Sequence, residues 1–422
     1  MDGEALEQRP SSADKIKELL QKGVDIPNPL SLDIGQEVDT ARISGRGVRI
    51  YPGCRIYGEK TVISEGAQIG REGPATIENC QIGPHVELKG GYFKESVFLE
   101  KANMGLGAHV REGCILEEQA NGAHCVGLKQ TILFPFVTLG SLINFCDCLM
   151  AGGTSRKDHS EVGSAYIHFN FTPDGDKTTA SLIGDVPRGV MLNQPAIFLG
   201  GQGGIVGPLR LGYGNVVAAG AILRRDFPED NKLIIAKSHR GTVTRYLPNL
   251  YPGLSRTVGN NILYLANLMA LEHWYSQVRL LFFTGEELGE LIYAGARDKL
   301  ALAKKERIKR LKAMAEKMPA SPERGDRNDR AASRKQQFQD KISEVCELFT
   351  GETASGPSVE RRDPFLERFH RHKSESGGSY IEVVQTLPSA VSQEGTQWLQ
   401  QIIDDLCMQT AVIMPSLGLF KK

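Results

Sequence analysis

The chain has 422 residues, more than one ordinary domain needs, so we expect two or more folded units. Hydrophobic residues make up 41%, enough for a core, and 50 Lys and Arg residues balance 50 Asp and Glu residues. This balance predicts no general attraction to nucleic acid or to an anionic membrane. The sequence has no apolar run of about 18 residues, and its polar N-terminus lacks a secretory signal, so we expect a cytoplasmic protein.

Residues 1–33 form an N-terminal segment that we expect to be helical. Ser11 and Asp14 make a capping pattern, and Gly23 provides a stop signal. The residues between them have helical spacing on one apolar side: Ile16, Leu19 and Leu20.

From residue 34 to about residue 240, glycine is dense and an aliphatic residue recurs every six positions. Six residues suffice for one short strand and a tight corner, and three such units return the chain above its starting point. The aliphatic residues then stack along the axis. We therefore predict a mainly β protein, a left-handed parallel β-helix over 34–240 with a C-terminal α-helical extension. The series are Ile50, Ile56, Val62; Ile63, Ile69; Ile82, Leu88; Met104, Val110, Leu116; Val126, Ile132; Val137, Ile143; and Ile205, Leu211, Val217, Leu223.

Residues 146–204 interrupt this period, and we predict that they form a polar insertion on the coil. The stretch is too long and too polar to be another plain rung. Polar loops on a rigid scaffold are common places for function, so we expect the functional residues of the protein here.

The C-terminal part is predicted to be helical. Over 241–318, one amphipathic helix is indicated by the three–four spacing from Leu268 to Phe282, and a second runs from about 286 to 318. The basic stretch 304–312 is interpreted as a solvated face with opposite-charge pairs. Residues 319–422 combine a flexible linker at 320–335 with helices near 336–349 and 393–408. The sequence leaves open whether these helices pack on the β-helix, form a lid or contact another subunit.

Two motifs carry a family resemblance: Asn-Phe-Thr-Pro-Asp-Gly-Asp-Lys at 170–177 and Val-Ala-Ala-Gly at 217–220. With their surroundings, residues 137–240 resemble the acetyltransferase half of the bifunctional glucosamine-1-phosphate acetyltransferase/N-acetylglucosamine-1-phosphate uridyltransferase family. In that family, an Asn-Tyr-Asp-Gly…Lys stretch binds the amino-sugar phosphate. A later Ile-Ala-Ala-Gly corner lines the acetyl-CoA cleft between neighbouring subunits of a trimer.

The resemblance implies a homotrimeric acyltransferase that takes acetyl-CoA as co-substrate and acts on an amino-sugar phosphate or a nucleotide-sugar. Asn170 and Asp174 would hold the sugar, and Lys177 would bind its phosphate. The corner that lines the acetyl-CoA cleft would consist of Ala218, Ala219 and Gly220.

The chain departs from the family pattern at three points. Phe171 replaces the family's Tyr, which removes one hydrogen bond to the sugar. The family's catalytic His lies in a Val-Gly-His stretch, and the nearest match here, Leu139-Gly140-Ser141, has no His. The Gly-rich loop of the uridyltransferase half occurs nowhere in the chain, so we expect no uridyltransferase activity.

Acyl transfer to an amine or hydroxyl needs a base that works near neutral pH, and His has a suitable intrinsic pKa. His159 lies between two acidic residues that could orient its ring, and it is the first candidate catalytic residue. His168 is the second, because on a strand it shares a face with Asn170. Its alternative role is that of a hydrogen-bonded rung histidine. His124 is a third candidate.

Arg156 and Lys157 follow the small residues Gly-Gly-Thr-Ser at 152–155. Exposed N–H groups followed by two cations suit a phosphate or pyrophosphate, so both are candidate substrate-binding residues. The alternative interpretation is an ordinary basic loop.

A metal site is not predicted. His85 and His109 are separated by a multiple of six residues and could stack on one face, but the gap to His124 breaks this spacing. The sequence contains no H-x-x-x-H or C-x-x-C motif in support.

The first hypothesis is therefore an acyltransferase with a small-molecule sugar substrate and with His159 or His168 as base. The second is a non-catalytic nucleotide-sugar-binding or scaffold protein on the same fold, which the missing Val-Gly-His favours. The third is a zinc lyase, which the metal content of the purified protein would identify.

Overall fold

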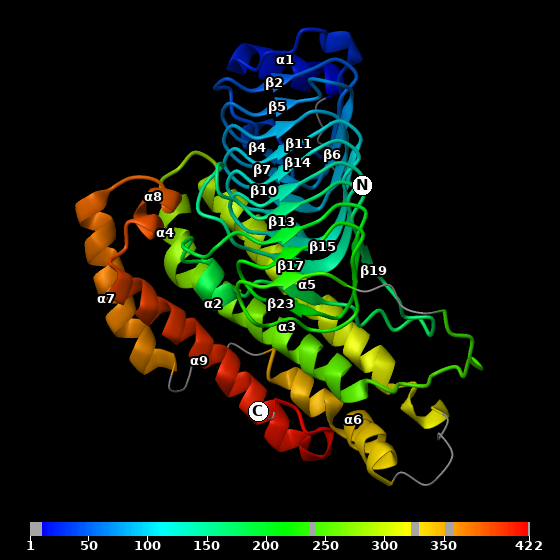
Figure 1. The fold of residues 1–422 in the computed structure, drawn as a ribbon. Helices are drawn as coiled ribbons and strands as arrows, with labels where there is room; N and C mark the ends of the chain where they lie inside the picture. Colours follow the sequence, from blue (N-terminus) through cyan, green and yellow to red (C-terminus); the bar gives the residue numbers. More distant parts are fainter. Residues whose placement is uncertain (1–10, 237–240, 322–328, 351–357, 421–422) are drawn as a thin grey trace, which may run out of the picture.

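The computed structural model describes residues 11–236, 241–321, 329–350 and 358–420. It consists of a parallel β-solenoid of about 11 turns over residues 33–234, followed by a helical region. Figure 1 shows the solenoid as a column, with the N-terminal helix at one end and the C-terminal helices beside the other end. The fold class predicted from the six-residue period is thus confirmed.

Each turn contributes strands to three faces, here named X, Y and Z in chain order, and equivalent strands of successive turns pair in parallel. Face X holds β2 (Arg49–Ile50), β5 (Gln68–Ile69), β8 (Glu87–Leu88), β11 (Asn103–Met104), β14 (Asn121–Gly122), β16 (Thr138–Leu139), β18 (Glu161–Val162), β21 (Phe198–Leu199), β24 (Val216–Val217) and β26 (Leu233–Ile234). Face Y holds β1 (Asp33–Ile34), β3 (Arg55–Tyr57), β6 (Ala75–Glu78), β9 (Gly91–Lys94), β12 (Ala108–Val110), β19 (Ile167–Phe169), β22 (Gly204–Val206) and β25 (Ile222–Leu223).

Face Z holds β4 (Val62–Ile63), β7 (Gln81–Ile82), β10 (Ser96–Phe98), β13 (Cys114–Leu116), β20 (Ser181–Ile183) and β23 (Arg210–Leu211). Two longer strands, β15 (Gly127–Leu133) and β17 (Asn144–Met150), run from face Y into face Z and pair with neighbours on both faces.

The aliphatic residues that define the six-residue period fill the axis of the solenoid. Every member of the predicted series is at most 2% exposed. Ile50, Ile69 and Leu88 illustrate the stacking, since each lies directly opposite the next in the register of face X. Each buried side chain of this size contributes roughly 1.5–3 kcal/mol, so the column is the main stabilising element of the solenoid.

The predicted insertion at 146–204 is not one insertion. Strands β17 to β22 lie within or overlap this range and continue the three faces. The additional residues form three separate loops at corners, 151–160, 170–180 and 184–197, and the last contains the short helix α2 (Val186–Gly189). The prediction failed because strands as short as two residues, separated by long loops, do not recur every six positions, so the period cannot be recognised in the sequence.

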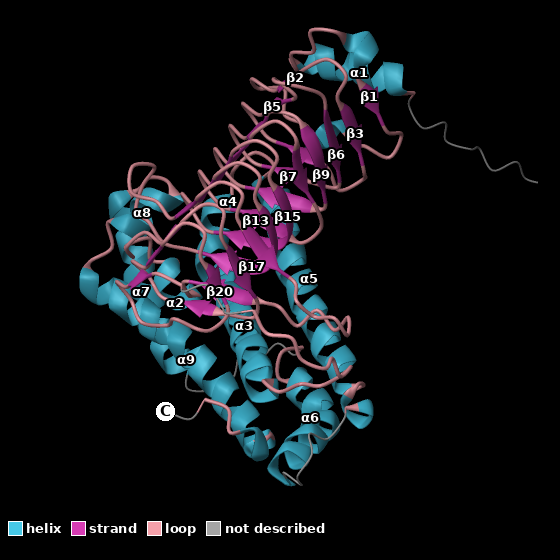
Figure 2. Cartoon of the chain, turned by 45° about the vertical axis from the view of Figure 1, so that its right-hand side comes forward, coloured by secondary structure: helices cyan, strands magenta, loops and turns pink. Residues whose placement is uncertain are grey.

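The N-terminal helix α1 (Ser12–Lys22) has the predicted capping box between Ser11 and Asp14, and Gly23 ends it with a left-handed backbone at φ 104°. Leu19 is fully buried against the first turn. The ammonium of Lys15 donates to the carbonyl oxygens of Gln36 and Val38 at 2.7 and 2.5 Å. The helix therefore covers the open end of the column, as Figure 2 shows.

The C-terminal helices pack on face Z and on one another. They are α3 (Leu254–Trp274), a π-helical turn (Tyr275–Arg279), α4 (Leu280–Phe283), α5 (Gly289–Ala315), α6 (Asp329–Glu347), α7 (Ser358–Ser376), α8 (Tyr380–Gln385) and α9 (Ser389–Ile413). Helix α5 contacts β7, β10 and β13, and α3 contacts β20. The question that the sequence left open is answered: these helices pack on the flank of the solenoid.

Two buried ion pairs join the helices to the solenoid. Arg279 donates to Glu118 at 2.5 and 3.1 Å, and its guanidinium lies 3.7 Å from the ring centre of Tyr380. Arg307 donates to Asp147 at 2.6 Å. The prediction of a solvated face at 304–312 is therefore wrong at Arg307, which is only 2% exposed, because Asp147 on β17 faces this helix.

Two further differences concern the tail. Helix α6 begins at Asp329, inside the predicted linker, and residues 322–328 of that linker lie outside the described residues. Helices α7 and α8 were not predicted. Phe365 and Phe369 of α7 are fully buried against Trp274 of α3, a contact that the charged sequence of α7 does not reveal.

Candidate functional site

The predicted site residues lie at three different corners of the solenoid, except for His168, which lies on β19. We name each corner by the faces that it joins: the loop 151–160 forms a Z–X corner, the loop 170–180 forms a Y–Z corner, and residues 218–221 form an X–Y corner. The first two loops flank β18 and β19 of one turn, and the third lies two turns further along the axis. Strands about 4.8 Å apart place these levels within roughly 10 Å of each other along the axis.

At the Z–X corner, Arg156 holds its own loop in place. One terminal nitrogen of its guanidinium donates to the carbonyl oxygens of Gln119 and Phe136 and to the hydroxyl of Thr138, at 2.9 to 3.1 Å. Burial lowers the pKa of Arg156. Lys157 is exposed, and no side-chain partner of its ammonium is found in the described part of the chain. Both side chains are exposed, but one nitrogen of Arg156 is committed to the loop, whereas the whole Lys157 ammonium is available to a ligand.

His159 at the same corner has the geometry of a base. Its Nδ1 lies 3.0 Å from the carbonyl oxygen of Arg156. A carbonyl can only accept, so this contact assigns the ring proton to Nδ1 and leaves Nε2 able to take up a proton. Nε2 lies 3.9 Å from a carboxylate oxygen of Glu161. The sequence prediction that Glu161 could orient the ring is compatible with this distance.

At the Y–Z corner, Asn170 and Lys177 are exposed and Asp174 is half-buried. The Asn170 side-chain oxygen accepts from Thr172 at 2.6 Å, and the Asp174 carboxylate accepts from the Tyr246 hydroxyl at 3.0 Å. The backbone of the loop is fixed from outside the solenoid. Arg307 of α5 donates to the Lys177 carbonyl at 3.1 Å, and Lys317 donates to the Asp174 carbonyl.

The His168 side chain points into the solenoid and not toward the surface beside this loop. It is 4% exposed, its Nε2 lies 2.7 Å from the Ser181 hydroxyl, and its ring packs edge-on against Phe145. Burial lowers its pKa to about 4, so the ring is neutral at physiological pH. This environment matches the alternative role of a hydrogen-bonded rung histidine, and it gives His168 no direct access to a substrate.

At the X–Y corner, Ala218, Ala219 and Gly220 stack over the glycines of the preceding turn. A side chain at Gly200 would lie 2.3 Å from the backbone nitrogen of Ala219, so only glycine fits there. Gly220 has φ 70°, and open space surrounds the position of a Cβ atom. The corner is therefore tightly packed inside and open outside, which suits an extended ligand along its outer edge.

Sequence reasoning missed one contact at the X–Y corner. His124 and Ser141 lie on adjacent turns, and their Nδ1 and Oγ atoms are 2.8 Å apart. Ser141 is the residue that stands where the family's Val-Gly-His motif would place a His. The register Gly122↔Leu139 aligns the two residues, and counting the period from the aligned strands would have revealed the pair.

The outward positions of face X change character along the axis. On the first seven turns they are polar: Arg49, Gln68, Glu87, Asn103, Asn121, Thr138 and Glu161. On the last three they are Phe198, Val216 and Leu233, all exposed. Ile167 and Ile222 are exposed on the adjoining part of face Y. We name these five residues the apolar edge. Neighbouring exposed apolar residues of this kind commonly mark a protein contact.

Neither of two surface cavities found in the described structure contains a predicted site residue. A cavity of about 720 Å³ lies at the first turns, and one of about 310 Å³ lies between the last turns and α9. Among the described residues, no group of three His, Cys, Asp or Glu side chains is placed to hold a metal ion. No described helix is long and apolar enough to cross a membrane.

Comparison with known proteins gives a distant relationship over the solenoid. No protein-family model matches the chain. The bifunctional protein GlmU of Thermotoga maritima is 28% identical over 215 residues, which cover 51% of this chain and 42% of GlmU. GlmU proteins of Carboxydothermus hydrogenoformans and Staphylococcus haemolyticus are 27% identical over 227 and 230 residues, 54% of this chain and 45% of theirs.

The chain thus spans less than half the length of these relatives. The similarity covers a β-solenoid region and is consistent with the hexapeptide acetyltransferase domain only. The resemblance recognised in the motifs is confirmed at this level, and it suggests a hexapeptide-repeat transferase family.

Proposed function

We propose that the protein is an acyltransferase that moves an acetyl group from acetyl-CoA to an amino-sugar phosphate or a nucleotide-sugar. The observation that carries the proposal is the arrangement of the three loops. Two of them, 170–180 and 218–221, contain the motifs that resemble functional stretches of a GlmU-like acetyltransferase domain, and the third, 151–160, contains His159. All three occupy nearby levels of one solenoid at its three corners. One chain cannot bring three corners of a filled column together, so the site is completed by neighbouring copies.

The apolar edge supports this assembly. Phe198, Val216 and Leu233 follow each other directly on face X, beside the corner that contains Ala218 to Gly220. Through this edge, solenoids could pack side by side in a closed ring. The X–Y corner of one copy would then lie against another corner of its neighbour, at the same level along the axis. A homotrimer is the assembly that the family resemblance implies.

The roles proposed for the residues combine the family resemblance with their surroundings. His159, with its proton on Nδ1, takes the proton of the attacking amine or hydroxyl on Nε2. Asn170 and Asp174 hold the sugar, while Lys177 and Lys157 present exposed ammonium groups to its phosphate. Arg156 acts mainly by fixing the loop. Acetyl-CoA supplies the activated acyl group, and the open edge at Ala218, Ala219 and Gly220 is where its extended arm would lie.

The proposal is tested by the release of free thiol from acetyl-CoA with a panel of amino-sugar phosphates and nucleotide-sugars as acceptors. His159→Gln should lower kcat by a factor of about 100 to 10,000, because loss of a general base has this effect. His370→Gln, an exposed histidine on α7, is the matched control and should retain activity. Absence of turnover with every acceptor, or full activity of His159→Gln, would refute the assignment.

A mixing experiment tests whether the site lies between copies. His159→Gln and Lys177→Met are each expected to be nearly inactive alone. If their residues meet across an interface, refolded mixtures regain activity, because random assembly makes about one interface in four carry both native residues. If both residues act within one chain, every mixture stays inactive.

A second candidate function is a non-catalytic nucleotide-sugar-binding protein. The specific observation in its favour is that His168 is buried in the core and that Leu139-Gly140-Ser141 lacks the family's histidine. Binding of a nucleotide-sugar in calorimetry, together with no thiol release from acetyl-CoA, would select this function instead.

A further inference from the structure

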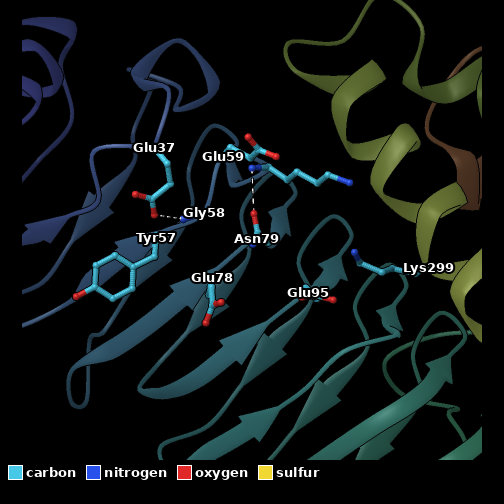
Figure 3. A pocket seen from close by; sticks show the side chains of 9 residues that line it. Glu37, Tyr57, Gly58, Glu59, Glu78, Asn79, Glu95 and Lys299 are labelled. Carbon is cyan, nitrogen blue, oxygen red and sulfur yellow. Dashed lines mark hydrogen bonds between the residues drawn. The ribbon is translucent and has the colours of Figure 1, made fainter. Parts of the chain in front are cut away.

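The larger cavity lies far from the candidate site, at the Y–Z corner of the first turns, and it is shown in Figure 3. Gly58, Asn79 and Glu95 form its floor, since they follow β3, β6 and β9 at this corner on three successive turns. Its wall on the other side is helix α5, which contributes Lys299. The volume of about 720 Å³ is in the range of pockets for small molecules.

Lys299 is the unusual residue of this cavity. Its side chain is 6% exposed and reaches from α5 toward the corner of the solenoid (Figure 3). In the described part of the structure its amine has no hydrogen bond and no ion pair. The carboxylates of Glu95 and Asp298 act on it only through longer-range charge, and burial lowers its pKa. A desolvated amine without a partner is costly unless something binds it.

The other charged groups of the cavity are divided between paired and unpaired ones. Glu78 accepts from Lys94 at 2.8 Å and from the Tyr92 hydroxyl at 2.9 Å, so its charge is compensated. Lys60 lies 3.3 Å from Asp298. Glu59 and Glu95 line the cavity without a side-chain hydrogen bond or ion pair among the described residues.

Glu37, whose carboxylate accepts from the Gly58 amide at 2.7 Å, adds a further negative charge. The cavity therefore presents the unpaired amine of Lys299 on the side of α5 and, along the solenoid, the carboxylates of Glu59 and Glu95, which have no partner among the described residues.

We propose that this cavity binds a small zwitterion, with its anionic group at Lys299 and its ammonium group at the glutamates. A ligand with only negative charge would meet the carboxylates, and one with only positive charge would leave the Lys299 amine unpaired. A molecule with both charges satisfies both sides. The anionic group is a carboxylate or a phosphate, since both accept hydrogen bonds from an ammonium group in the same way. The site is independent of the proposed acyl transfer, because no residue is shared.

The probes are 4-aminobutanoate and 2-aminoethyl phosphate, and the single-charge controls are butanoate, inorganic phosphate and butylamine. Binding to the full chain is measured by ligand-observed nuclear magnetic resonance. We expect at least one zwitterion to bind at least tenfold more tightly than any control, and the better one identifies the anionic group. If neither zwitterion binds below about 10 mM, or if a control binds as tightly, the proposal is wrong.

Variants test the position of the ligand. Lys299→Met and Glu59→Gln should each weaken binding of the zwitterion about tenfold or more, because a hydrogen bond to a charged group is lost. Lys305→Met, an exposed lysine of the same helix, is the matched control and should bind normally. Lys299→Met should also melt no lower than the native protein, because it removes an unpaired buried amine. Unchanged binding by Lys299→Met overturns the proposal.

Discussion

Glu117 lies buried between the solenoid and the helical layer, and its protonation should govern how strongly the two parts hold together. The Tyr275 hydroxyl donates to a carboxyl oxygen of Glu117 at 2.6 Å. The guanidinium of Arg279 forms its ion pair with the neighbouring Glu118. Burial raises the pKa of Glu117 to about 7, and the charge of Glu118 adds to this effect, although Arg279 opposes it. The ordinary value of such a carboxyl is 4.5.

This difference fixes the sign and size of a pH effect. Between pH 4.5 and about 7, the folded protein binds a proton at Glu117 that the unfolded chain does not bind. The free energy of unfolding therefore falls as pH rises through this window and stays constant with respect to this group above it. The gap between the two pKa values corresponds to about 3 kcal/mol. The variant Glu117→Gln keeps an acceptor for Tyr275 and has no charge to bury.

The assay is urea unfolding followed by tryptophan fluorescence. The chain has two tryptophans, and both Trp274 in α3 and Trp398 in α9 are buried in the helical layer, so the signal reports on that layer. Glu117→Gln should match the native protein near pH 4.5 and should be more stable by about 3 kcal/mol at pH 8. Glu87→Gln on face X is the control and should show no such change. A difference between Glu117→Gln and the native protein that is the same at both pH values would refute the reasoning.

Three other predictions concern the solenoid and its anchors. Arg307→Met should destabilise the protein by about 3–5 kcal/mol, because it leaves the Asp147 carboxylate buried without its ion pair, and adding Asp147→Asn should recover much of the loss in melting temperature. His168 has its pKa lowered to about 4, so its own contribution to the free energy of unfolding should fall as pH drops from 6.5 to 4. His168→Gln lacks this contribution, so urea unfolding should show its stability shifting upward relative to the native protein as pH drops over this range, and a difference that does not change with pH would contradict the assignment. Gly200→Ala should cost about 1–3 kcal/mol, because its Cβ would lie 2.3 Å from the Ala219 nitrogen; a melting curve by circular dichroism that matches the native one would argue against this packing.

The candidate site residues could be selected from the sequence one by one, but their arrangement could not. Residue type and motif were enough to select His159, the Asn170 to Lys177 stretch and the Ala218 to Gly220 corner. Their separation onto three corners depends on how many residues each loop adds between strands, and two-residue strands such as β18 are too short to be located from the sequence. Lys299 and His124 acquire their neighbours only when the turns and α5 are placed in space.

The sequence by itself determined the column, because a period of six is a local property that each rung repeats and the next turn reinforces. It also determined α1, whose capping residues lie within a few positions of one another. Only the tertiary structure decided that Arg307 is buried against Asp147 and that Phe365 of α7 packs between Trp274 and Trp398. The physical reason is that these contacts join residues far apart in the chain. Burial of their charged or apolar side chains becomes favourable only after the partner element packs against them and excludes water from both.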